Sequence, residues 1–285
     1  MLMYWYSKYL PVFEKPVEDV PDSVISEIRK KFEKFKTQEE PLATISIIAQ
    51  NEEDHIISCL WSLADNVCDY PIEILAIDNH STDRTGEIMK SAGLKYLYEE
   101  KKSPGYARQC GLTHSRGKYH LCMDGDTLYP PHFIQTYIET LKEPGIIAVS
   151  SLWSFVPDKD HSLRSIKTYE ILRNIHLRLL FHKRPELVIR GMVFGFDAKA
   201  GKEIGFRTNI KRGEDGAMAV GLKKLGKIKL LKSSKTEVVT CLRTLNNDGS
   251  LQKNFYIRMK KALKGLKKYF IAQEEYKDQE DNIIK

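Results

Sequence analysis

The stretch Tyr119-His120-Leu121-Cys122-Met123-Asp124-Gly125-Asp126-Thr127 decides the fold of this 285-residue chain. Its strand-like apolar residues run directly into two aspartates separated by one glycine, and Pro130-Pro131 interrupts the chain shortly afterwards. The pattern predicts a buried strand with both carboxylates at its carboxyl end. In open α/β sheets, ligands bind in the crevice beyond that end. We expect Asp126 to hold a hard divalent cation, and Asp124 to reach a ribose hydroxyl or the same cation.

The same residues also fit a simple Asp-Gly turn that ends a strand, because short matches of this kind are common. The rest of the chain therefore has to decide between the two interpretations. Gly125 would serve either of them, since a glycine lets the backbone approach a neighbour closely.

The composition is that of a soluble globular protein, with 42% hydrophobic and 29% charged residues. It fits one large α/β domain with additions or two smaller domains. No apolar run approaches the roughly 18 residues that span a bilayer, and residues 1–10 lack the pattern of a signal peptide. Five cysteines without C-x-x-C spacing indicate a reducing cytoplasm. The net charge of +7 suggests an anionic partner such as a nucleoside diphosphate or an acidic membrane surface, and is too diffuse to indicate nucleic acid.

Strand and helix patterns alternate from residue 41 onward. Apolar, β-branched runs predict strands, and amphipathic segments with polar caps predict helices between them. The predicted strands are 44–49, 72–77, 94–98 and 119–123, and the predicted helices are 53–64, 82–92 and 105–115. This alternation predicts a doubly wound, mostly parallel sheet flanked by helices, with its functional loops at one edge.

Polar residues follow these strands and fit a nucleotide. Asp78 and Asn79 come directly after the second strand, where they can bond a base edge or a ribose hydroxyl. Arg108, near the start of a helix, is placed to meet a base or a diphosphate. Taken singly, Asp78 fits a helix cap and Arg108 fits a solvated surface, but several polar strand ends in one domain favour a binding site.

In order and spacing, four segments over about residues 42–225 resemble family 2 glycosyltransferases of the GT-A fold. They are Ile45 to Glu53, Ala76 to Thr85, Ala107 to Asp126, and Arg212-Gly213-Glu214-Asp215. The resemblance implies an inverting, metal-assisted transfer of a sugar from a nucleoside diphosphate sugar, with UDP or GDP as the nucleotide and Mg²⁺ or Mn²⁺ as the ion.

The resemblance also implies roles for individual residues. Asp124 and Asp126 would bind the donor's ribose and, through the ion, its diphosphate, and Asp78 and Asn79 would contact base and ribose. Asp215 would be the catalytic base, with Glu214 as its neighbour. Chemistry supports these residue types, because a divalent ion neutralises the leaving diphosphate and a carboxylate can take the proton of the acceptor hydroxyl. An Asp in the first turn of the predicted helix 214–225 is equally typical of helix capping.

The segment 206–213 is polar, basic and ends in glycine. We expect it either to fold over the diphosphate, with Lys211 or Arg212 supplying positive charge, or to be an ordinary solvated loop.

The chain departs from the family pattern in several places. Asn79 stands where relatives often have a second aspartate, Gln109 stands where they often have asparagine, and Ala49-Gln50-Asn51 replaces the usual opening motif. The base preference is therefore left open. No histidine follows His182, so the downstream histidine that ligates the metal in some relatives has no counterpart.

Three further segments complete the chain. Residues 162–182 carry a wide apolar helical face typical of core, and the strand-like residues 189–196 follow on what is the acceptor side in relatives. The candidate acceptor-binding aromatics are Trp153, Phe155 and Phe194, each of which could instead be packing. Residues 254–271 alternate apolar and basic residues at helical spacing, which fits either a membrane-surface helix or a helix that packs on the domain.

The predicted domains are a helical appendage (1–40), a GT-A domain (41–250) and a basic amphipathic helix with a tail (251–285). The predicted function is glycosyl transfer to a saccharide or lipid-linked acceptor in cell-surface polysaccharide or glycolipid synthesis. The predicted location is the cytoplasm, with or without peripheral attachment to the inner face of the plasma membrane. One alternative is a sugar nucleotidyltransferase, which would need a glycine-rich basic loop where residues 50–53 are acidic. The other is a non-catalytic, membrane-associated adaptor on a transferase scaffold, which would be expected to lose Asp126 or Asp215.

Overall fold

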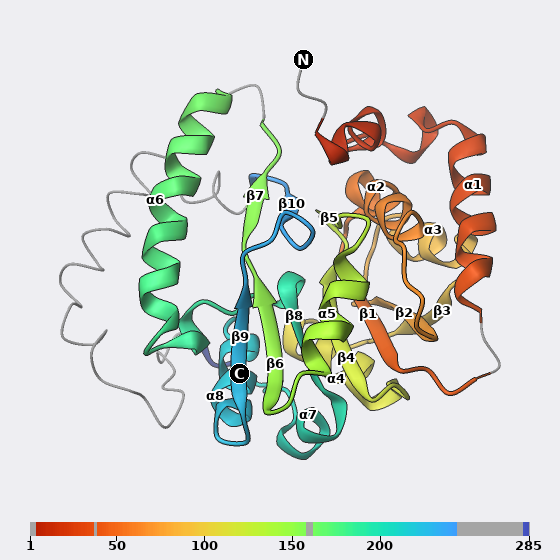
Figure 1. Ribbon diagram of the computed structural model, residues 1–285. Coiled ribbons are helices and arrows are strands. Elements are labelled where there is room, and N and C mark those ends of the chain that lie inside the picture. Colours follow the sequence, from red (N-terminus) through yellow and green to blue (C-terminus); the bar gives the residue numbers. More distant parts are fainter. Residues whose placement is uncertain (1–3, 37–38, 158–161, 244–281, 285) are drawn as a thin grey trace.

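The computed structural model describes residues 4–36, 39–157, 162–243 and 282–284. Its main sheet has seven strands in the order β3-β2-β1-β4-β8-β6-β9 (Figure 1). Neighbouring strands are parallel except at β8, which is antiparallel to both β4 and β6. The strands are β1 Ala43–Ala49, β2 Ile72–Asp78, β3 Lys95–Tyr98, β4 Tyr119–Asp124, β6 Ile146–Ser151, β8 Phe194–Asp197 and β9 Lys227–Leu231. The predicted mostly parallel α/β sheet is confirmed.

The register of the parallel strands brings the polar strand ends together. Ile48 of β1 pairs with Asp124 of β4, and Ala49 pairs with Asp78 of β2. Alternation along β1 sends Ile45 and Ile47 into the larger hydrophobic core. The carboxyl ends of β1, β2 and β4 therefore form one edge at which their following loops meet.

Helices cover both faces of the sheet (Figure 1). Helices α1, α2, α3 and α5 pack into the larger core, and α4, α7 and α8 cover the other face. The helices are α1 Asp22–Phe32, α2 Glu53–Ala64, α3 Thr85–Ser91, α4 Pro104–His114, α5 Phe133–Leu141, α6 Leu163–Phe181, α7 Ala198–Ile204 and α8 Glu214–Lys223. Short 3₁₀ turns are η1 Trp5–Lys8, η2 Leu10–Val12, η3 Val17–Asp19, η4 Glu33–Phe35, η5 Pro185–Leu187 and η6 Gly191–Val193.

A second, three-stranded sheet lies next to the edge at which these loops meet. Its order is β5-β10-β7, with β5 Thr127–Leu128, β7 Trp153–Phe155 and β10 Val238–Thr240. Thr240 pairs with Thr127, directly after the two aspartates, and with Phe155 of β7. This sheet therefore carries the chain after residue 240 back to Asp126.

The N-terminal residues pack on the domain. Val24, Ile28 and Phe32 of α1 are buried in the larger core, and α1 contacts α2. Tyr6 and Tyr9 pack in a separate cluster with residues of β5 and β10. The spacing of apolar residues over 24–36 predicts a helix, and in the structure this helix begins two residues earlier and ends at Phe32, where a 3₁₀ turn takes over.

Helix α6 departs from the prediction that its apolar face is core. Ile166, Leu177 and Leu180 are buried, but Ile175 is 51% and Leu179 71% exposed. Helix α6 lies at the side of the described part of the molecule (Figure 1), and only part of its apolar surface is buried there. The apolar surface of α6 is therefore wider than the part of it that is buried against the rest of the domain.

Two predicted boundaries also differ. The strand expected over 189–196 is a 3₁₀ turn at Gly191–Val193 followed by β8, and the helix expected over 214–225 ends at Lys223. The predicted basic helix 254–271 lies outside the described residues.

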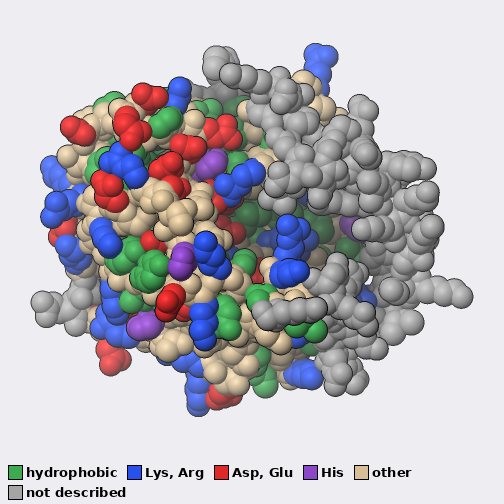
Figure 2. All heavy atoms as spheres, turned by 180° about the vertical axis from the view of Figure 1, so that it is seen from behind, with side chains coloured by type: hydrophobic (Ala, Val, Ile, Leu, Met, Phe, Trp, Pro, Cys, Tyr) green, Lys and Arg blue, Asp and Glu red, His purple; other side chains and the backbone are tan. Residues whose placement is uncertain are grey.

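On the face opposite to that of Figure 1, the described surface is hollowed near its middle, and lysine and arginine side chains stand around the hollow (Figure 2). Acidic and basic side chains are interspersed over the rest of this face. Among the described residues, no helix is both long and apolar enough to cross a membrane.

Candidate active site

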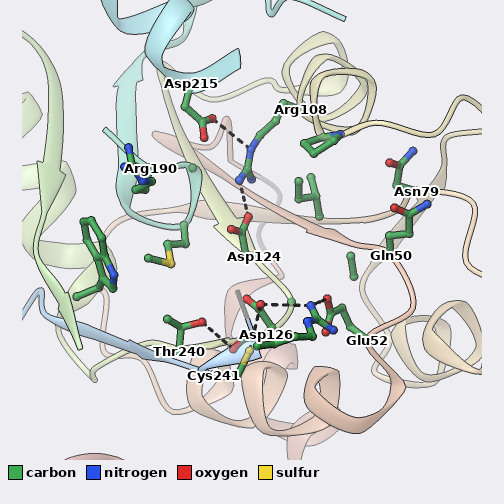
Figure 3. A pocket seen from close by; sticks show the side chains of 18 of the residues that line it. Gln50, Glu52, Asn79, Arg108, Asp124, Asp126, Arg190, Asp215, Thr240 and Cys241 are labelled. Atoms are coloured by element: carbon green, nitrogen blue, oxygen red, sulfur yellow. Dashed lines mark hydrogen bonds and ion pairs between the residues drawn. The ribbon is translucent and has the colours of Figure 1, made fainter. Parts of the chain in front are cut away.

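A pocket of about 520 Å³ opens at the carboxyl ends of β1 and β4 (Figure 3). Residues from both sheets, from α4, α6 and α8 and from the turn before β8 line it. Its charged lining residues are Glu52, Arg108, Asp124, Asp126, Arg173, Arg190, Glu214, Asp215 and Arg243. The pocket brings together the sequence-predicted residues Asn79, Arg108, Asp124, Asp126, Glu214 and Asp215.

The two aspartates enter the pocket from the tight connection between β4 and β5. Asp124 ends β4, and Gly125 continues along β1 by donating its amide hydrogen bond to Ile48 O (2.9 Å). A Cβ on Gly125 would lie 2.9 Å from the Cβ of Ala49, so a larger residue would push the connection away from β1. Glycine therefore suits the close packing of this connection against β1.

Arg108 connects the end of β4 with the start of α8 by contacting one aspartate in each. It is only 2% exposed, and its Nη1 donates to Met123 O (3.0 Å). Its Nη2 pairs with Asp124 Oδ1, and its Nε lies 3.5 Å from Asp215 Oδ1 (Figure 3). A Cβ on Gly191 would collide with this guanidinium, which explains the glycine there. Arg108 thus holds two carboxylates from distant segments, instead of presenting a free cation to a nucleotide.

The carboxyl groups around Arg108 have raised pKa values. Burial raises the pKa of Asp215, against the lowering effect of the Arg108 charge. Burial, together with the neighbouring charge of Asp215, raises the pKa of Glu214 to about 7. Both residues lie in the first turn of α8, as predicted. The site therefore contains a carboxylate pair that titrates nearer to neutrality than ordinary carboxyls do.

Asp126 belongs to a second charged cluster. Its Oδ1 accepts a hydrogen bond from Thr127 Oγ1 (3.0 Å), and its Oδ2 lies 3.5 Å from Arg243 Nη2. The same Arg243 nitrogen pairs with Glu52 Oε1. The Cys241 thiol lies 3.6 Å from Asp126 Oδ2. Burial, with the nearby Glu52 charge, raises the pKa of Asp126, and Arg243 opposes that change.

Asn79 lies across the pocket from Arg190, with Gln50 beside it (Figure 3). Its Nδ2 donates to Lys101 O (2.7 Å), and its Oδ1 accepts from Ser103 N (3.1 Å). These bonds hold the side chain in the loop that forms this end of the pocket.

Asp78 is not brought to the pocket wall formed by the described residues. It is 4% exposed, and its carboxylate accepts hydrogen bonds from Ser81 N (2.9 Å) and Tyr96 Oη (2.8 Å). Both oxygens are used to shape the loop after β2. The alternative that Asp78 caps the next helix does not fit either, because α3 begins at Thr85 and Asp78 bonds Ser81 and Tyr96 instead.

Lys211 and Arg212 also lie away from the pocket lining of the described chain. Their backbone amides donate to Asn282, at 2.8 Å from Lys211 to the carbonyl and 3.1 Å from Arg212 to Oδ1. Ile210 forms an isolated β-bridge with Ile283. In this arrangement the loop 206–213 is tied to residues 282–284 rather than to the aspartates.

The side of the pocket that carries Arg190 is aromatic and basic. Trp153, Phe155, Tyr169, Arg173 and Arg190 line it. Two of the three predicted acceptor-side aromatics, Trp153 and Phe155, are therefore in the pocket. The third, Phe194, is fully buried in the core beneath α7 and α8.

The sequence interpretation missed Glu52, Arg173, Arg190 and Arg243 as pocket residues. Arg243 follows Asp126 by more than a hundred residues, and only the pairing of β10 with β5 brings them together. Arg173 sits on α6 among apolar residues, where a single arginine has no distinguishing pattern. No local spacing signal marks either residue, so the tertiary structure was needed to find them.

The residues around Asp124 and Asp126 fit a divalent ion in one specific way. The described residues contain no group of three or more His, Cys, Asp or Glu side chains arranged to hold a metal by themselves. Mg²⁺ and similar ions, however, are commonly held by one or two carboxylates together with substrate phosphates and water. Two partly exposed aspartates whose pKa values are raised by desolvation, lining a pocket large enough for a ligand, suit such a shared site.

Comparison with known proteins agrees with this geometry. The model of the glycosyl transferase family 2 matches residues 44–202, which is more than half of the chain. An uncharacterized glycosyltransferase of Rickettsia prowazekii is 33% identical over 100 residues, or 34% of this chain. The match spans 31% of that relative, so this chain corresponds to under a third of its length.

Two solved structures share the fold. The mannosyltransferase PcManGT from Pyrobaculum calidifontis, in complex with GDP-Man and Mn²⁺, has a TM-score of 0.55 and 16% identity, covering 84% of this chain and 68% of that one. Glucosyl-3-phosphoglycerate synthase from Mycobacterium tuberculosis, with Mn²⁺, UDP-glucose and phosphoglyceric acid, has a TM-score of 0.53 and 18% identity, covering 83% and 82%. The architecture is therefore the GT-A fold, and the chain belongs to glycosyl transferase family 2.

Proposed function

We propose that this protein transfers a sugar, with inversion, from a nucleoside diphosphate sugar to the hydroxyl of a saccharide or lipid-linked acceptor. One observation carries the proposal: Asp124, Asp126 and Asp215 converge on one pocket from separate segments, with Arg108 between two of them. A carboxylate for the hydroxyl and carboxylates for a diphosphate-bound cation are what this reaction requires. A sugar nucleotidyltransferase is less well supported, because the loop after β1 carries Glu52 and Glu53 where basic residues would be needed.

The donor would lie with its base toward Asn79 and Gln50 and its diphosphate near Asp124 and Asp126. The two aspartates would hold Mg²⁺ or Mn²⁺, and the ion would neutralise charge that develops on the departing diphosphate. Support for a UDP- or GDP-sugar comes from the ligands named for the two structural relatives. Asp78 would act indirectly, by holding the loop that presents Asn79.

Asp215 would be the general base. As the acceptor oxygen bonds to the anomeric carbon, its proton passes to the Asp215 carboxylate, and the bond to the diphosphate breaks with its electron pair leaving on the nucleotide. Arg108 would keep the carboxylate oriented and Glu214 would influence its ionisation. We place the reaction in cell-surface polysaccharide or glycolipid synthesis, at the inner face of the plasma membrane if residues 254–271 bind lipid.

Thermal stability with added nucleotides tests the donor site. We would measure the melting temperature of the full chain with UDP, GDP, CDP and dTDP, each with and without Mn²⁺. Because a ligand that binds the native state stabilises it, one nucleotide should raise the melting temperature by several degrees only in the presence of metal. An unchanged melting temperature with all four would contradict the proposed donor site.

The Asp126→Ala variant should remove the metal-dependent part of this stabilisation. Losing one of two ion-binding carboxylates should weaken metal-assisted nucleotide binding by at least about 10-fold, with the fold retained. The matched control is Asp69→Ala, an exposed aspartate outside the pocket. Calorimetric titration of nucleotide in the presence of Mn²⁺ measures the effect. If Asp126→Ala bound nucleotide with the affinity of wild type, the assignment of Asp126 to the metal site would be wrong.

The Glu214→Gln variant should change how stability depends on pH. The pKa of Glu214 is raised to about 7, so its contribution to stability is complete below its unfolded pKa and is lost as pH rises through about 7. Glutamine has no such loss. The stability of the variant relative to wild type should therefore increase by about 1 kcal/mol between about pH 6 and pH 8.

Urea denaturation at several pH values measures this difference, with the exposed Glu203→Gln as the control that should show none. If Asp215 is the base, Glu214→Gln should also retain most transfer activity. A pH-independent difference from wild type would show that Glu214 does not titrate as described.

A further inference from the structure

We propose that the acceptor carries an anionic group, a phosphate or a carboxylate, which binds to Arg173 and Arg190 beside Trp153. The inference rests on the proposed glycosyl transfer and names the class of acceptor that this pocket would take. It starts from a buried cation for which the described residues supply no carboxylate partner.

Arg173 is this cation. It projects from α6 into the pocket and is only 8% exposed. Its Nη2 donates to Trp153 O, and Nε and Nη2 both donate to the neutral amide oxygen of Asn174, at 3.2 and 2.9 Å. Within the described residues its Nη1 is buried without a hydrogen-bond partner, and no carboxylate forms an ion pair with it. A buried charge without a counter-ion is costly, so the site is built to receive an anion.

The nearest acidic residue on the same helix is committed elsewhere. Glu170 Oε1 accepts the amide hydrogen of Phe155 (2.8 Å), and Oε2 pairs with Lys167 Nζ (3.1 Å). Burial lowers the pKa of Arg173 to about 10, which leaves the side chain protonated at neutral pH. The charges of Glu170 and Glu237 oppose this lowering of the pKa, but within the described residues neither carboxylate forms an ion pair with Arg173.

Arg190 adds a second guanidinium at the same place. The Cζ of Arg173 lies 4.5 Å and that of Arg190 5.7 Å from the ring centroid of Trp153. Phe155 and Tyr169 enclose Arg173 further, at 5.2 and 5.8 Å from its Cζ. The Arg190 charge lowers the pKa of Arg173, so the two guanidinium groups repel each other, and an oxyanion bound between them would be attracted by both.

The position of Arg173 and Arg190 indicates that they bind the acceptor and not the donor. Arg190 and Asn79 lie on opposite sides of Asp124 (Figure 3). Arg108 pairs with Asp124 and Asp215, and Arg243 pairs with Glu52 and Asp126, so the cations on the donor side of the pocket serve carboxylates. The Arg190 charge also lowers the pKa of Asp215. An anion at Arg173 and Arg190 would thus hold the acceptor on the side of the base.

Aromatic rings suit the remainder of such an acceptor. The face of Trp153 offers an apolar surface to a sugar ring, while the two guanidinium groups beside it bind the charged substituent. A neutral sugar would use the ring alone and leave Nη1 of Arg173 without a partner. The pocket should therefore discriminate strongly by charge.

The test uses calorimetric titration of the full chain, with and without saturating nucleotide and Mn²⁺. The probes are α-glucose 1-phosphate, glucuronate and the neutral methyl glucoside. At least one charged probe should bind at least about 10-fold more tightly than methyl glucoside, and the stronger of the two shows whether phosphate or carboxylate is preferred.

The variants Arg173→Gln and Arg190→Gln should each weaken the preferred probe by at least about 10-fold and change nucleotide affinity by less than about twofold. Arg178→Gln, an exposed arginine on the same helix, is the matched control and should behave as wild type. Arg190→Gln, which leaves the buried Arg173 intact, decides the question if Arg173→Gln lowers the melting temperature.

Equal binding of charged and neutral probes by the wild type would overturn the inference. A loss of nucleotide affinity that parallels the loss of probe binding would overturn it too, by assigning the arginines to the donor. Failure of every nucleotide to bind would count against the proposed function instead, and the nucleotide-free titration would still decide whether the arginines bind an anion.

Discussion

Replacing Asp215 by asparagine is expected to reduce sugar transfer by about 10² to 10⁴-fold, the usual contribution of a general base. The amide has nearly the same shape as the carboxylate but cannot accept the proton of the acceptor hydroxyl. Because Asp215 lies on α8 and the proposed donor residues lie after β1, β2 and β4, nucleotide binding should be retained.

Two measurements separate these effects. Transfer is followed as release of nucleoside diphosphate from the donor identified by thermal stabilisation, and donor binding is followed by calorimetry. Asp69→Asn, on the surface, is the control for the amide substitution itself. Turnover of Asp215→Asn within about threefold of wild type would exclude Asp215 as the base.

Replacing Arg108 by methionine should have the largest effect on stability. Arg108 is 2% exposed and pairs with Asp124 and Asp215, so its removal leaves two carboxylates in a buried site without their cation. Breaking a buried ion pair by removing one partner costs about 3–5 kcal/mol. The pKa values of both aspartates should rise further, because the Arg108 charge lowers them in the native protein.

Urea denaturation at neutral pH measures the loss. Part of it should be recovered in mildly acidic solution, where the two aspartates can take up protons. Arg108→Lys keeps the charge and loses the forked geometry, so an intermediate stability is expected. The control is Arg178→Met on the exposed face of α6. A loss below about 1 kcal/mol for Arg108→Met would mean that the ion pairs do not hold the site together.

Local sequence patterns were sufficient to predict much of the fold. The run from Tyr119 to Asp126, the three strands between residues 43 and 98 and the helices between these strands depend on apolar periodicity and short-range capping, which a single sequence displays. The boundaries that differ, at Phe32, Lys223 and Gly191, are places where the pattern fades gradually and tertiary contacts decide where the element ends.

The pocket was predicted less completely. Asp124, Asp126, Asn79 and Asp215 could be found because each stands directly after a strand or at the start of a helix, where side chains are expected to reach a common edge. Asp78 satisfies the same rule, yet its carboxylate is occupied by Ser81 and Tyr96. Position in the chain shows that a residue is near the edge, but it does not show what the side chain contacts.

The sequence by itself determined the order of strands and helices from residue 43 to Asp126, and thereby the edge at which acidic residues collect. Tertiary structure alone decided that Arg108 joins Asp124 to Asp215, that β10 carries Arg243 to Asp126, and that Arg173 is buried beside Trp153 without a carboxylate partner among the described residues. The physical reason is the distance along the chain over which each kind of interaction acts. Periodicity reflects neighbours a few residues apart, whereas the charge balance of a buried site depends on side chains that only the completed packing brings within a few ångströms of one another.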